Sequence, residues 1–168
     1  MTTIAKLLKH DFTKGSLNLF DTNGNLTYFE DSNGFWVKRE FDSNGKETYH
    51  EDSNEYWSKG EFNSNGNQTY YGDSDGFWVK REYNSNCNLT YSEDSDKHWA
   101  KWERDSNGRE IYFEDSTGYW SKYEYNSNGN QTYYENSNGT VSDNRPKANC
   151  SGKTVTIDGI EYELKAKK

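Results

Sequence analysis

The sequence predicts an all-β fold: an elongated antiparallel meander of about twelve short strands, made of six β-hairpin repeats and closed by a C-terminal capping hairpin. Three observations predict it. A 21-residue unit recurs six times without a gap over 20–145. Every unit holds two turn signals that begin with Asx-Ser/Thr, such as Asp-Thr-Asn-Gly at 21–24. The runs between turns are rich in aromatic residues, Thr and Val, and they lack helical spacing. We expect the meander to twist or curl into a roll.

The first 19 residues precede the repeats. We expect them to form an N-terminal cap with a short helix around Ile4–Leu8. A cap is needed because a long exposed edge strand invites pairing with other chains.

The repeat region, 20–145, consists of the copies FDTNGNLTYFEDSNGFWVKRE, FDSNGKETYHEDSNEYWSKGE, FNSNGNQTYYGDSDGFWVKRE, YNSNCNLTYSEDSDKHWAKWE, RDSNGREIYFEDSTGYWSKYE and YNSNGNQTYYENSNGTVSDNR. The first Asp or Asn of each turn is suited to accept a hydrogen bond from its own backbone two residues on. The Gly that follows tolerates a positive φ.

Strand alternation sorts the side chains into two faces. Trp36, Lys38 and Glu40 share one face, and Val37 and Arg39 share the other. The same types recur every 21 residues, so stacking aligns them into columns of Trp, Lys, Glu and Tyr. We interpret the Trp and Tyr columns as core packing rather than a ligand cage. The Lys and Glu columns are interpreted as solvated ladders that set register, each pair contributing about 0.2–1 kcal/mol.

The last copy departs from the pattern in TVSDNRPKANCSGK, which is followed by TVTIDGIEYELKAKK. Asp158-Gly159 is a two-residue hairpin signal between two strand-like runs. We therefore divide the chain into an N-terminal cap (1–19), six β repeats (20–145) and a C-terminal capping hairpin (146–168).

Composition limits the core and the location. Leu, Ile, Val and Phe make up only 23 of 168 residues, and the net charge is -8, a balance typical of disorder. Fourteen Tyr and six Trp instead favour a thin aromatic core. No apolar run reaches membrane-spanning length and the start lacks a signal-peptide pattern, so we expect a cytoplasmic protein. Cys87 and Cys150 are expected to be free thiols rather than a disulfide.

The motifs indicate no catalytic chemistry. The Asp-Ser-Asn-Gly turns superficially resemble calcium loops, but strands rather than helices flank them and half of the first turns begin with Asn. Paired acids such as Glu30-Asp31 recur in most copies, whereas catalysis needs one tuned site. We predict no enzyme activity, no catalytic residue, no cofactor and no metal.

Charge is distributed unevenly between the two sets of turns, which a meander places on opposite edges. One edge carries thirteen acids against Lys97 alone, and the other carries five acids against three bases. The acids of the first edge are Glu30, Asp31, Glu51, Asp52, Glu55, Asp73, Asp75, Glu93, Asp94, Asp96, Glu114, Asp115 and Glu135.

The stretch GFWVKREFDSNGKETYHEDSNEYW resembles the variant MORN repeats of bacteria in its Gly-x-Trp, aromatic, Asn-Gly turn and Tyr. It is also similar to the YD repeats of Rhs-type proteins and, more weakly, to choline- or glucan-binding repeats of Gram-positive surface proteins. These resemblances imply a β-hairpin repeat with a binding or antitoxin-like role and no catalytic residues.

We expect a protein-binding inhibitor whose acidic edge mimics nucleic acid and blocks a host effector, as a phage or prophage anti-defence protein blocks a CRISPR effector. The alternatives are an antitoxin or immunity protein, a carbohydrate- or choline-binding module, and an edge that serves only solubility. We expect a basic protein partner and neither direct nucleic-acid binding nor membrane association. Pairing of sheet ends into a homodimer and a monomer are both left open. The expected partner-binding residues are Glu30, Asp31, Glu51, Asp52, Asp73, Asp75, Glu93, Asp94, Glu114 and Asp115.

Overall fold

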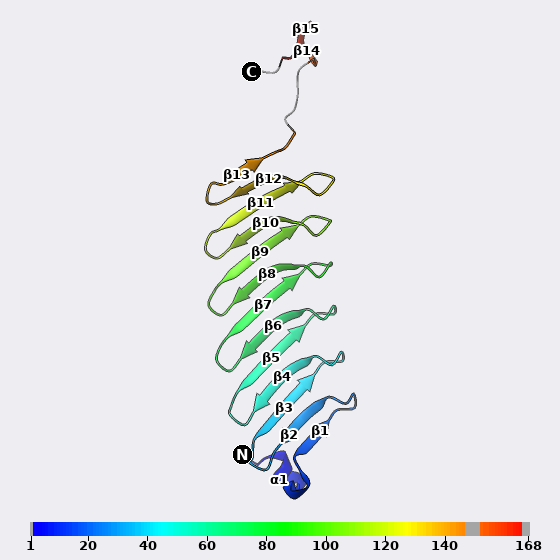
Figure 1. The fold of residues 1–168 in the computed structure, drawn as a ribbon, viewed down its shortest axis with the longest axis vertical. Coiled ribbons are helices and arrows are strands. Elements are labelled where there is room, and N and C mark those ends of the chain that lie inside the picture. The colour runs from blue at the N-terminus through cyan, green and yellow to red at the C-terminus, as the bar shows by residue number, and fades with distance from the viewer. Residues whose placement is uncertain (1, 147–151, 166–168) are drawn as a thin grey trace.

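The computed structural model describes residues 2–146 and 152–165, and it is all-β as predicted (Figure 1). Thirteen strands form one antiparallel sheet in which each strand pairs with the next in the chain, from β1 to β13. The strands are β1 (Leu17–Phe20), β2 (Leu26–Glu30), β3 (Trp36–Phe41), β4 (Glu47–Asp52), β5 (Trp57–Phe62), β6 (Gln68–Asp73), β7 (Trp78–Tyr83), β8 (Leu89–Asp94), β9 (Trp99–Arg104), β10 (Glu110–Asp115), β11 (Trp120–Tyr125), β12 (Gln131–Asn136) and β13 (Val141–Asp143).

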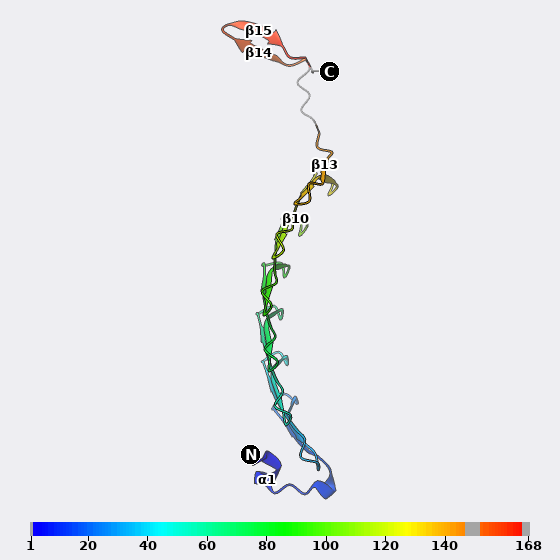
Figure 2. The same ribbon diagram turned by 90° about the vertical axis from the view of Figure 1, so that its left-hand side faces the viewer.

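The sheet is a single open layer. Figure 2 shows it edge-on as a gently curved band, and no second layer of strands covers either face in the described part of the chain. The expected roll is therefore wrong: the sheet curves without closing. Because nothing covers most of the sheet, the Trp column is only partly buried, and Trp57 keeps 40% of its surface exposed.

Two kinds of turn alternate along the chain and lie on opposite edges of the sheet, as the sequence predicts (Figure 1). We call them A turns and B turns, and the edges they form the A edge and the B edge. The A turns are 21–25, 42–46, 63–67, 84–88, 105–109 and 126–130; the B turns are 31–35, 52–56, 73–77, 94–98, 115–119 and 136–140.

Both kinds of turn close in the same way. In the first A turn, the amide of Asp21 donates to the carbonyl of Asn25 (2.9 Å), and the amide of Gly24 donates to the carbonyl of Asp21 (3.1 Å). Gly24 has a φ of 86°, in the left-handed region that only glycine adopts without cost. The expected turn chemistry is thus confirmed in detail.

The register confirms the predicted division into two faces and shows a stagger. Glu61, Tyr70, Lys80, Glu93 and Trp99 are successive partners across the five strands β5 to β9. We call the face that carries these columns the lysine face. Each pairing of an odd strand with the following even strand slips next to the A turn, as between Glu82 and Tyr83.

The short helix expected before the repeats is present as α1 (Ile4–Leu8). A short 3₁₀ turn, η1 (Phe12–Lys14), leads into β1. Ala5, Leu17 and Tyr28 are buried together, with Trp36 packed against them. This cluster is the thickest part of the core, because only here does a helix cover the sheet.

The C-terminal hairpin also lies where predicted, as β14 (Thr154–Ile157) and β15 (Ile160–Glu163). It forms a two-stranded sheet of its own and does not extend the 13-stranded sheet. Its role as a cap stays a prediction. Cys87 is a free, exposed thiol, and Cys150 lies outside the described residues. No helix in the described ranges has the length and apolar character needed to cross a bilayer.

Candidate protein-binding edge

The acids predicted to gather on one edge do lie along the B edge. Each belongs to a B turn or directly precedes its first residue. The aspartates at the first turn position are Asp31, Asp52, Asp73, Asp94 and Asp115, and Asp75 is a third-position residue. The glutamates Glu51, Glu93 and Glu114 face the Lys and Trp columns, since Lys38, Lys80 and Lys101 are their register partners.

Glu30 differs from the other candidate residues because α1 covers it. It is 3% exposed and accepts hydrogen bonds from the amide of Ala5 (3.0 Å) and the hydroxyl of Tyr28 (2.7 Å). Burial opposes its ionisation, but hydrogen bonds from Thr3, Tyr28 and Ala5 outweigh burial and lower its pKa. Glu30 therefore belongs to the N-terminal cap and not to an accessible surface.

The first residue of each B turn has a structural task. Oδ1 of Asp73 accepts the amides of Asp75 (3.1 Å) and Phe77 (3.2 Å), which organises the turn. In the last repeat Asn136 accepts the equivalent amides of Asn138 and Thr140, both at 3.1 Å. An amide oxygen thus closes this turn as a carboxylate does.

The same equivalence holds on the A edge. There, three turns begin with Asp and three with Asn, as in Asn63, whose Oδ1 accepts the amides of Asn65 and Asn67, both at 3.0 Å. On the B edge five of six turns begin with Asp. The turn geometry does not require this excess of carboxylates.

A column of glutamates near the A edge was left out of the expected charge balance. Its members lie at the A-edge ends of the odd strands: Glu40, Glu61, Glu82, Glu103 and Glu124. Much of their charge is paired, because Lys38, Lys59 and Lys101 form ion pairs with the glutamate two residues on, at 3.1, 2.8 and 3.5 Å. These three lysines form their ion pairs on the lysine face near the A edge and not with an aspartate of a B turn.

The linear charge of the B edge is close to that of a nucleic-acid strand. Successive B turns are two strand spacings apart, about 9–10 Å, so the six turns extend over about 50 Å. Without the buried Glu30, the twelve other acids over this length give one carboxylate per about 4 Å, against about 3.4 Å per phosphate for one strand of B-DNA.

The B edge also exposes aromatic rings on the face opposite the lysine face. The fifth residue of a B turn packs on the strand before the turn, as Phe35 does on Phe29 and Phe77 on Tyr71. Phe35 and Phe77 remain 36% and 43% exposed. Exposed aromatic rings among charged groups are typical of protein-binding surfaces.

One group that sequence reasoning missed lies in the fourth B turn. Ligand atoms of Asp94, Asp96 and His98 lie within 4.8 Å of one another. These three residues are alternate positions of one turn, and the turn brings their side chains together. Sequence rules for metal sites look for the spacing of His and Cys, so they do not detect this group. Oδ1 of Asp94 is already occupied by the amides of Asp96 (2.9 Å) and His98 (3.0 Å).

Comparison with known proteins gives structural likeness only. The crystal structure of TcdB2-TccC3-Cdc42 matches 71% of this chain and 7% of that chain, with 14% identity and a TM-score of 0.48. The structure of the Photorhabdus luminescens Tc holotoxin pore matches 76% of this chain and 9% of that chain, with 13% identity and a TM-score of 0.44. The chain thus spans less than a tenth of the length of these structures. No protein-family model and no curated protein matches the sequence. The finer resemblance to variant MORN or YD repeats stays a prediction.

Proposed function

We propose that this chain is a non-enzymatic inhibitor that binds a protein partner through the B edge, where its row of carboxylates occupies a basic surface built for nucleic acid. A phage or prophage protein that blocks a CRISPR effector or another defence enzyme is the setting in which such a decoy acts.

The preference for Asp over Asn at the B turns carries this proposal. Asn136 shows that an amide closes the same turn with the same backbone contacts. The A turns use both residues equally. Five carboxylates that the fold does not need therefore lie along one edge, and a charge-dependent partner explains their position.

The spacing and stiffness of the edge support a decoy. Each B turn after the first is tied to the previous repeat by a backbone hydrogen bond, as the amide of Ser74 donates to the carbonyl of Trp57 (2.8 Å) and that of Ser95 to the carbonyl of Trp78 (2.9 Å). A row of charges held at fixed spacing attracts a basic groove by the electrostatic steering that phosphates use. Little entropy is lost on binding because the row is already ordered.

The second candidate is an antitoxin or immunity protein. The exposed rings of Phe35 and Phe77 favour it, because apolar contacts on the same edge bind a partner with little dependence on salt. The two candidates therefore differ in how affinity responds to ionic strength.

Charge-neutralising variants test the proposal without disturbing the turns. The B-edge variant is Asp52→Asn, Asp73→Asn and Asp94→Asn together, and the control is Asp21→Asn, Asp42→Asn and Asp105→Asn on the A edge. Proteins captured from a host lysate by the wild-type chain are eluted with duplex DNA or heparin, then tested for nucleic-acid binding with and without the chain.

The proposal predicts that the captured protein loses nucleic-acid binding when the wild-type chain is added. The B-edge variant should inhibit at least about tenfold less, because three contacts of a salt-dependent interface are lost. The A-edge control should inhibit as the wild type does. Equal inhibition by all three chains, or elution that DNA cannot bring about, would remove the decoy proposal.

A further inference from the structure

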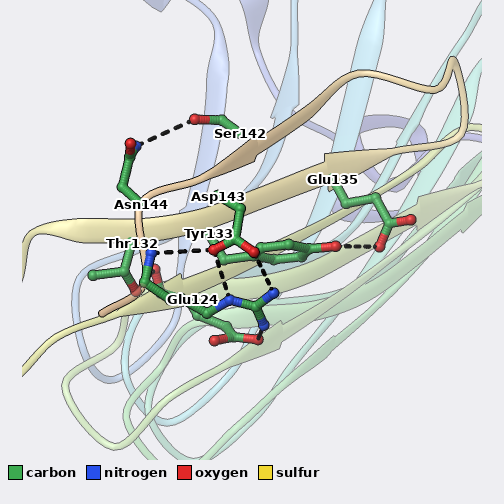
Figure 3. A network of polar contacts seen from close by, with 8 residues as sticks. Glu124, Thr132, Tyr133, Glu135, Ser142, Asp143 and Asn144 are labelled. Atoms are coloured by element: carbon green, nitrogen blue, oxygen red, sulfur yellow. Dashed lines mark hydrogen bonds and ion pairs between the residues drawn. The ribbon is translucent and has the colours of Figure 1, made fainter. Parts of the chain in front are cut away.

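The last repeat binds an arginine of the same chain, and this contact shows what the lysine face recognises. The guanidinium of Arg145 lies over the ring of Tyr133, 4.1 Å from its centroid. It forms ion pairs with Glu124 (3.1 Å) and Asp143 (2.7 Å). Figure 3 shows Tyr133 between Glu124 and Asp143, with its hydroxyl donating to Glu135. A planar cation is thus held by one aromatic ring and two carboxylates.

Two of these three groups recur at each junction between successive repeats. Glu124 and Tyr133 are register partners on neighbouring strands. The same pairing joins Glu40 with Tyr49, Glu61 with Tyr70, Glu82 with Tyr91, and Glu103 with Tyr112. We call each of these a Glu–Tyr pair.

The surface is hollowed at these pairs. A shallow groove is lined by Glu103, Tyr112, Lys122, Glu124 and Tyr133, among others. Three repeats earlier the equivalent residues line a second groove: Glu40, Tyr49, Lys59 and Glu61, among others. The hollow therefore recurs at equivalent positions three repeats apart and is not confined to the chain end.

The lysine column shows two arrangements that decide whether a Glu–Tyr pair is open. In one, Lys38 pairs with Glu40 and its Nζ lies 5.3 Å from the ring of Tyr49. In the other, Lys80 and Lys122 lie over Trp78 and Trp120, 5.0 and 5.1 Å from the rings.

In the second arrangement, the lysine does not form an ion pair with the glutamate two residues further along the same strand. Where Lys122 turns to Trp120, Arg145 occupies Glu124 and Tyr133. Where Lys80 turns to Trp78, Glu82 has no ion-pair partner and Tyr91 has no cation over its ring among the residues that the structure describes. The pair Glu82–Tyr91 therefore has no bound cation, whereas the pair Glu124–Tyr133 binds Arg145 of the same chain.

We propose that the Glu–Tyr pairs are arginine-binding subsites for a partner segment that carries arginines about one repeat apart, with Glu82–Tyr91 the subsite open in this structure. This inference rests on the proposed function, because it gives the chemistry of the basic partner. The lysines that pair with Glu40, Glu61 and Glu103 are displaced onto their tryptophans when an arginine enters, a change of small cost since exposed ion pairs are weak.

The geometry favours arginine over lysine. A guanidinium stacks on an aromatic ring and pairs with a carboxylate at the same time, whereas an ammonium is a compact charge that binds one group well. The repeat spacing of about 9–10 Å matches every third residue of an extended segment.

A synthetic peptide tests the proposal. It carries an arginine at every third position with Gly and Ser between, and the matched peptide carries lysine at the same positions. Binding is measured by calorimetry at low salt to the wild-type chain and to Glu82→Gln, Tyr91→Leu and, as a control of equal charge change, Glu161→Gln on the separate two-stranded sheet. Circular dichroism of each variant establishes that the sheet is intact.

We expect the arginine peptide to bind at least about tenfold more tightly than the lysine peptide, since several subsites act together. Glu82→Gln and Tyr91→Leu should each weaken the arginine peptide about three- to fivefold and reduce its advantage over lysine. Arg145→Ala should strengthen binding, because it opens the subsite at Tyr133.

Equal binding of the two peptides, or an arginine preference that Glu82→Gln and Tyr91→Leu leave intact, would overturn the inference. That result leaves the proposed function standing if the B-edge variant with Asn at 52, 73 and 94 still inhibits poorly. Conversely, arginine-selective binding together with full inhibition by that variant supports the inference and contradicts the B-edge proposal.

Discussion

Removing the Glu30 carboxylate should detach the N-terminal helix from the sheet. This carboxylate accepts the amide of Ala5 at 3.0 Å and the hydroxyl of Tyr28 at 2.7 Å in a nearly closed site. Hydrogen bonds to a charged group contribute about 1.5–3 kcal/mol each, so Glu30→Ala should cost about 3–5 kcal/mol at the N-terminal end. The matched variant is Glu51→Ala one repeat later, where no helix covers the carboxylate and the loss should be much smaller.

Amide hydrogen exchange measures this change locally. The amide of Ala5 should exchange much faster in Glu30→Ala than in the wild type or in Glu51→Ala, and the fluorescence of Trp36 should shift as its cover is lost. Urea unfolding followed by circular dichroism gives the accompanying loss of stability. Unchanged protection of Ala5 in Glu30→Ala would refute the assignment of Glu30 to the cap.

The same site should make the cap sensitive to acid. The pKa of Glu30 is lowered from its ordinary value of 4.5, so its contribution to stability is complete above that value. The contribution should be lost as the pH falls through the lowered pKa, because the protonated acid no longer accepts both hydrogen bonds. In Glu30→Gln, protection of the Ala5 amide should lose this pH dependence.

Three further outcomes follow from single residues. Glu55 has a φ of 67° at a turn position where Gly76 has 86°, so Glu55→Gly should stabilise and Gly76→Ala destabilise by about 1 kcal/mol each in urea unfolding. Burial raises the pKa of Tyr28 to about 12, so ultraviolet titration should show one more tyrosine ionising far above pH 10 in the wild type than in Tyr28→Phe, with stability lost as the pH rises toward that pKa. The hydrogen bond from Arg109 lowers the pKa of Asp105. The amides of the fifth A turn should therefore lose protection from hydrogen exchange as the pH falls through this lowered pKa, and Asp105→Asn should abolish this pH dependence.

Much of the fold can be predicted from the sequence because the turns and strands of each repeat depend on residues that are close together in the chain. The turn signals place both edges, alternation separates Trp36 and Lys38 from Val37, and the helix at Ile4–Leu8 begins after Thr3, whose hydroxyl accepts the amide of Lys6 (3.4 Å). These features depend on neighbours a few residues apart. For the same reason the sequence predicts which acids lie on the B edge.

What the sequence did not predict depends on contacts between distant residues. The sheet stays open because β1 and β13 do not pair with each other, and the alternation within each strand does not determine pairing between strands so far apart. The burial of Glu30 requires a helix 25 residues away, although its copy of the repeat looks like the others. The contacts of Arg145 with Glu124 and Tyr133 were not predicted, because the last copy departs from the pattern of the other five.

That copy in fact reverses the charges of the repeat. The positions held by Lys38 and Glu40 in the first copy are held by Asp143 and Arg145 in the last. The reversal places the cation over Tyr133 after the lysine column has ended. A pattern search by residue type misses this exchange, whereas the summed charge of the two positions is conserved.

The most direct test of the account is a nuclear magnetic resonance titration of the chain with a lysine-rich peptide, which reports charge without the preference for arginine. The account predicts that amide shifts appear first in the B turns, at 31–35, 52–56, 73–77, 94–98 and 115–119, and that they disappear as salt is raised. Shifts of equal size in the A turns, or shifts that persist at high salt, would contradict the claim that one edge of this sheet is the electrostatic binding surface.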